Sequence, residues 1–163
     1  MVILMDFFEQ LSERARKINQ HMDKETDTTM IILKGHLLVE ETLSEILKYT
    51  LKESNPMTIK IHNMMFSQKA NLVWALKHDK MRLNVWPSLK RLNTIRNKMA
   101  HSLEPSDIDA LIEVFVKGVE KDWNDSYHLK LEILDLKSAI AWVESTLGYI
   151  LNQMFENDAN HYS

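Results

Sequence analysis

Only three glycines and three prolines occur in this chain of 163 residues. Barrels and sandwiches need many tight turns, which these two residues form most readily, and a glycine-rich phosphate loop needs several glycines together. The chain has too few of either residue for such structures. Its many Leu, Lys and Glu residues and its ten Met residues favour helix over strand. The composition therefore predicts an all-α fold.

Apolar residues recur at the spacing of an α-helix in every long segment of the chain. This pattern predicts a first helix over residues 6–22 and later helices over 28–53, 63–78, 87–103, from about 106–109 onward, and 134–155. Two short segments, 58–62 and 128–133, alternate at the period of a strand, which fits either extended segments or the ends of helices. From about Asn157 we expect a frayed tail. Residues 1–163 are therefore expected to form one domain, a bundle of five or six helices with the second and the fourth at its centre.

The chain contains no cysteine, which excludes a disulfide scaffold, a thiol nucleophile, a cysteine-based zinc site and an iron–sulfur cluster. It also has no HExxH motif, no P-loop and no dinucleotide fingerprint, so we expect no cofactor and no metal. His36 and Glu40 are four residues apart on one predicted helix face. That spacing suits a metal ion, but a direct contact between the two side chains is the favoured interpretation.

The first five residues are apolar, but Asp6, Glu9 and Glu13 follow them. This pattern does not match a secretory signal, which needs a basic start and a longer apolar stretch. No run approaches the roughly 18 apolar residues of a membrane span. We therefore expect a cytoplasmic protein with no membrane partner.

Basic residues gather between residues 60 and 100, where nine Lys and Arg residues stand against one acid, Asp79, for a formal charge of +8. Two interpretations fit this segment. Acidic neighbours neutralise a basic helix pair, or the segment faces phosphates, because clustered Lys and Arg are typical of nucleic-acid binding. The second interpretation predicts an exposed set of RNA-binding residues: Lys69, Lys90, Arg91 and Lys98.

The end of the fourth predicted helix carries the candidate catalytic residues Arg96, Asn97 and His101. Asn97 and His101 are four residues apart, so they are neighbours on one face of the helix. Spacing alone favours a structural explanation, because the helix dipole stabilises cations at a helix C-terminus.

An Arg followed by a polar residue, with a His after a gap of four residues, resembles the signature of the HEPN superfamily (higher eukaryotes and prokaryotes nucleotide-binding domains). Arg96, Asn97 and His101 fit this Arg-x4-His motif at the end of a helix. Residues 35–40 and 66–76 are similar to the branch that contains relatives of the mannitol-operon repressor. The resemblance covers residues 28–104 and implies an all-α fold.

The resemblance also implies a metal-independent endoribonuclease, as a toxin or phage-defence effector, that acts on RNA as a homodimer and has a cognate antitoxin or a regulatory protein as a further partner. His101 would move protons near neutral pH, Arg96 would stabilise the phosphate, and Asn97 would orient His101 or the phosphate. A two-fold dimer would bring two such pairs into one cleft. Glu40 lies on the central predicted helix and is expected to face Arg96, either to orient it or in a purely structural pair.

The repressor-like branch implies an alternative, which is a non-catalytic interaction module that regulates transcription by contact. In that case Arg96 and His101 are residues of the fold or of an interface. An exposed His101 in a basic cleft favours the enzyme, and a packed His101 favours the module. A third alternative is binding of a nucleotide or of RNA without cleavage.

Overall fold

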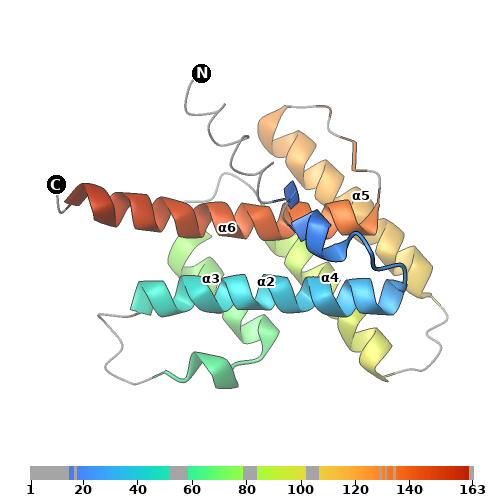
Figure 1. Cartoon of the computed structure of the whole chain (residues 1–163), viewed down its shortest axis with the longest axis horizontal. Helices are drawn as coiled ribbons and strands as arrows, with labels where there is room; N and C mark the ends of the chain where they lie inside the picture. Colours follow the sequence, from blue (N-terminus) through green and yellow to red (C-terminus); the bar gives the residue numbers. More distant parts are fainter. Residues whose placement is uncertain are drawn as a thin grey trace.

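The computed structural model describes residues 15–16, 18–51, 59–78, 84–101, 107–128, 130, 132–133 and 135–161. Residues 15–16 and 18–22 are helical. The later elements, in chain order, are α2 (Thr28–Leu51), the short 3₁₀ helix η1 (Ile61–Asn63), α3 (Phe66–Lys77), α4 (Trp86–His101), α5 (Ile108–Tyr127) and α6 (Leu136–His161) (Figure 1). No strand occurs among the residues that the structure describes. The prediction of an all-α bundle is confirmed.

Helix α2 lies at the centre of the bundle. It contacts α3, α4 and α6, and it lies alongside α6 in Figure 1. A helix with several helical neighbours must be apolar on more than one side, and α2 has fully buried residues along its length: Ile32, Val39, Leu43, Ile46 and Leu47. Helix α4 contacts α2, α3 and α5. The predicted central positions of these two helices are therefore confirmed.

Gly35 allows α2 and α6 to approach closely. A Cβ atom at this position would come within 2.6 Å of side-chain carbons of Ile140 on α6, which is closer than atoms in a packed core normally lie. The missing side chain therefore sets the distance between the two helices.

The ends of the helices can be compared with the sequence-based expectations. His128, at the start of segment 128–133, takes a left-handed conformation (φ 54°) and ends α5, so this part of the segment is the end of a helix, one of the two expected alternatives. The backbone N–H of Ile133 donates to the carboxylate of Glu120 on α5, at 2.9 Å, and not to a second strand. Helix α6 continues to His161, past the expected start of a frayed tail at Asn157. Most of the predicted helix over residues 6–22 lies outside the described residues.

Candidate functional site

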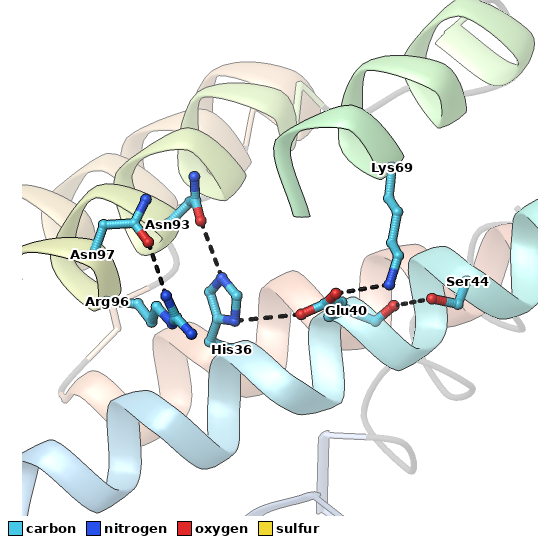
Figure 2. A network of polar contacts seen from close by, with 7 residues as sticks. All are labelled: His36, Glu40, Ser44, Lys69, Asn93, Arg96 and Asn97. Atoms are coloured by element: carbon cyan, nitrogen blue, oxygen red, sulfur yellow. Dashed lines mark hydrogen bonds and ion pairs between the residues drawn. The ribbon is translucent and has the colours of Figure 1, made fainter. Parts of the chain in front are cut away.

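The three candidate catalytic residues lie in the C-terminal half of α4. His101 is the last residue of the helix and is exposed, whereas Arg96 and Asn97 are half-buried. Nη1 of Arg96 donates a hydrogen bond to Oδ1 of Asn97 at 3.1 Å. The Arg96 side chain reaches from α4 toward His36 of α2 (Figure 2). Arg96 and Asn97 therefore form a bonded pair, and His101 is accessible one turn further along the helix.

A polar network lies beside this pair, with the buried side chain of His36 at its centre. Nε2 of His36 donates to Oδ1 of Asn93 at 3.1 Å, and Nδ1 lies 3.8 Å from Oε2 of Glu40 (Figure 2). The His36 ring stacks on Phe66 of α3, with the ring centroids 4.2 Å apart. The predicted contact between His36 and Glu40 is present. The sequence did not indicate that His36 also joins α2 to α3 and α4.

The prediction that Lys69 lies on an exposed RNA-binding surface is wrong. Its side chain is 6% exposed, and its Nζ lies 2.7 Å from Oε1 of Glu40. Lys69 stands four residues before Val73 on the buried face of α3, so packing of this face against α2 takes the lysine inside. Glu40 was expected to face Arg96. It contacts Lys69 and His36 instead, and His36 lies between Glu40 and Arg96 in Figure 2.

Two of the other predicted RNA-binding residues are also paired with carboxylates. Nη1 of Arg91 lies 3.4 Å from Oδ2 of Asp122 on α5, and Lys98 pairs with Asp107. Lys90 differs from them, because it is exposed and has no carboxylate partner within the described part of the chain. Acidic neighbours therefore neutralise three of the four predicted RNA-binding residues, and Lys90 is the one whose surroundings best suit a phosphate.

Burial lowers the pKa of His36 below its ordinary value of 6.5. The hydrogen bond with Asn93 and the negative charge of Glu40 oppose this shift. The positive charges of Arg96 and Lys69 add to it. The neutral form of His36 therefore predominates in the folded protein at pH 7.

The free energy of unfolding should fall as the pH is lowered from about 7 to about 5. The unfolded chain takes up a proton on His36 near pH 6.5, while the folded protein takes it up only at a lower pH. His36 thus contributes its full stability above the unfolded pKa and loses it as the pH falls through the folded pKa. Urea unfolding at several pH values measures this loss. His36→Gln should flatten the profile, and an unaltered slope in His36→Gln would show that another group is responsible.

An open groove of about 820 Å³ lies between α3 and α4. Aromatic, basic and amide side chains line it, including Phe66, Trp74, Trp86, Lys90 and Asn93. Trp74 is 49% exposed, and its ring stacks on His78 with the centroids 4.9 Å apart. Asn93 lines the groove and also holds His36, so the groove adjoins the polar network. No feature of the sequence identified this groove, because it depends on how the two helices are placed.

Within the described ranges, no group of three or more His, Asp and Glu side chains is arranged to hold a metal ion. None of the helices in these ranges combines the length and the apolar character that crossing a membrane requires. Comparison of the chain with protein-family models, curated proteins and solved structures finds no match. The resemblance to the HEPN superfamily therefore stays a prediction.

Proposed function

We propose that this chain is a metal-independent endoribonuclease that acts in the cytoplasm as a homodimer. His101 transfers protons, Arg96 stabilises the phosphate, and Asn97 positions Arg96. The observation that carries the proposal is the exposure of His101 at the end of α4. A histidine kept for packing is expected to be enclosed, as His36 is, whereas an acid–base group must reach its substrate.

The reaction uses the 2′-OH of the RNA as its nucleophile. His101 accepts the proton of this hydroxyl while the 2′-oxygen forms a bond to the adjacent phosphorus. The bond from phosphorus to the 5′-oxygen breaks, and His101 of the partner subunit donates a proton to that oxygen. The products are a 2′,3′-cyclic phosphate and a 5′-hydroxyl. Two subunits are required because one histidine cannot act as base and acid in the same step.

Arg96 acts on the charge that develops in the transition state. Its guanidinium donates hydrogen bonds to the phosphate oxygens, whose negative charge rises as the 2′-oxygen attacks. The 3.1 Å hydrogen bond to Oδ1 of Asn97 limits how the guanidinium can turn. Preorganisation of this kind lowers the barrier, because the charge meets a donor that is already in place.

An apolar stripe on α2 favours a second candidate function. Met30, Leu33 and Leu37 follow one another at helical spacing and are 42%, 39% and 55% exposed. Contiguous exposed apolar side chains mark protein interfaces. In the ribonuclease, which would be a toxin or phage-defence effector, this stripe binds the second copy or an antitoxin. In the alternative, the chain is a non-catalytic module that regulates transcription by binding a regulatory protein through the stripe.

An RNase assay on the purified protein separates the two functions. With EDTA present, we expect fragments of a labelled RNA that end in a 2′,3′-cyclic phosphate, because the proposed chemistry uses only the RNA and protein side chains. Light scattering should give about twice the chain mass of 19.2 kDa. A folded dimer that cleaves no RNA would favour the interaction module. Cleavage by a monomer would contradict the shared site.

A further inference from the structure

We infer that the groove between α3 and α4 binds a base of single-stranded RNA, which stacks on Trp74 while Lys90 contacts a neighbouring phosphate. The inference rests on the proposed function, because it assigns a subsite for that enzyme's substrate. The groove, at about 820 Å³, has the size of a small-molecule site, which is typically about 300–1,000 Å³.

Trp74 has the surroundings of a stacking platform. Its side chain is 49% exposed within the groove. The ring of His78 stacks on the indole, and Nδ1 of His78 donates to the backbone carbonyl of Trp74 at 2.9 Å. His78 is thereby held against one face of the indole, and a base stacks on the opposite face. Bases of single-stranded RNA bind proteins by stacking on aromatic rings in this way.

The charge of the groove walls suits an anion. Neither α3 nor α4 contains an Asp or a Glu. Lys90 lies on the rim of the groove and has no carboxylate partner among the described residues, so its ammonium group is available for a phosphate. This pairing of one aromatic ring with one unpaired cation matches a nucleotide better than it matches an apolar peptide.

Asn93 supplies a polar contact at the side of the groove. Its Oδ1 accepts the hydrogen bond from His36 at 3.1 Å, and its amide nitrogen points away from His36 in Figure 2. That NH₂ group can donate to the edge of a base, which is how proteins read unpaired bases.

One face of α4 connects the groove with the candidate catalytic end. Four polar side chains follow at intervals of four, three and four residues: Lys90, Thr94, Asn97 and His101. These intervals place the side chains on one face of the helix. From Lys90 to His101 the helix rises about 16 Å. A strand whose base stacks on Trp74 can therefore follow α4 to His101.

A binding titration with an RNA that cannot be cleaved tests the groove without relying on catalysis. The probe is a fluorescein-labelled single strand of roughly 12 nucleotides, within the usual site sizes, with every 2′-OH methylated. Trp74→Ala should weaken binding by about 5- to 150-fold, as expected for the loss of one stacked base. Trp74→Phe keeps an aromatic face and should retain most of the affinity. Lys90→Ala should lower the slope of log K against log salt by about 0.7, since it removes one phosphate contact.

Lys121→Ala is the control for the loss of one surface lysine. Lys121 is exposed and pairs with Asp125 on α5, a helix that does not line the groove. This variant should change neither affinity nor salt slope beyond the general effect of one surface charge. Circular dichroism checks that each variant is folded.

A parent protein that does not bind the probe, or a Trp74→Ala variant that binds as tightly as the parent, would overturn the inference. Trp74-dependent binding without cleavage of ordinary RNA supports the subsite and contradicts only the proposed enzyme. Cleavage that is unaffected by Trp74→Ala contradicts only the subsite.

Discussion

Replacing His101 with alanine should lower the rate of RNA cleavage by about 100- to 10,000-fold, the contribution of a positioned acid–base group. His101 is exposed at the last position of α4. The fold should therefore lose no more than the interaction of a cation with the helix dipole, about 1 kcal/mol. Single-turnover cleavage of a labelled RNA measures the rate, and urea unfolding measures the free energy of unfolding.

The matched control for this variant is His62→Ala, which removes an exposed histidine from η1 and should leave the rate unchanged. Arg96→Ala should slow cleavage by a similar order, because the transition state loses a positive charge. Arg96 is half-buried and bonded to Asn97, so its replacement also disturbs packing. The His101 variant is therefore decisive. If this variant cleaves RNA as fast as the parent, His101 is not the acid–base group. If it unfolds the protein while sparing trace activity, His101 has a structural role.

Charge reversal at Lys69 should destabilise the fold by about 3–5 kcal/mol, as breaking a buried ion pair does. The new carboxylate of Lys69→Glu would lie beside Glu40, at a position where the lysine side chain is only 6% exposed. Such a loss is a large part of the roughly 5–15 kcal/mol that stabilises a domain. Urea unfolding followed by far-ultraviolet circular dichroism should show a lower midpoint with an unchanged slope.

Lys90→Glu is the matched control, because it reverses an exposed lysine that has no carboxylate partner in the described part of the chain. Its free energy of unfolding should stay within about 0.5 kcal/mol of the parent. Exchanging the charges, with Glu40→Lys in the Lys69→Glu background, should recover part of the loss. Equal stability of Lys69→Glu and Lys90→Glu would mean that the ion pair of Lys69 does not contribute to the fold.

Helical periodicity was sufficient to predict the class of fold and the central helices. A helix that packs on several neighbours repeats its buried positions every 3–4 residues, and α2 does so from Ile31 to Leu47. The two alternating segments, 58–62 and 128–133, were harder to interpret, because five or six residues are too few to distinguish the period of a strand from the end of a helix. The end of α5 depends on the left-handed conformation of His128. The course of the segment after α5 depends on the hydrogen bond from the backbone N–H of Ile133 to the carboxylate of Glu120. The alternation of apolar and polar residues in the sequence does not reveal this bond.

The sequence was sufficient to place the candidate catalytic residues at the end of a helix. It was not sufficient to predict the surroundings of the basic residues. A count of charges between residues 60 and 100 does not include the acids that other helices bring close, such as Glu40 and Asp122. A helical projection of α3 would have identified Lys69, which lies between the buried residues Phe66 and Val73. The other contacts of the site depend on tertiary packing. One example is His36 of α2, which contacts residues of α3 and α4.

The stretch of α4 between Lys90 and His101 contains no glycine and no proline. An uninterrupted helix of this length does not bend at a single point, so its two ends keep a constant separation of about 16 Å. An RNA anchored in the groove would meet His101 at a set number of nucleotides from the anchored base. The length of the helix would then set the cleavage position by its distance from the anchored base. The identity of the bases between the anchored base and the cleavage position would not matter.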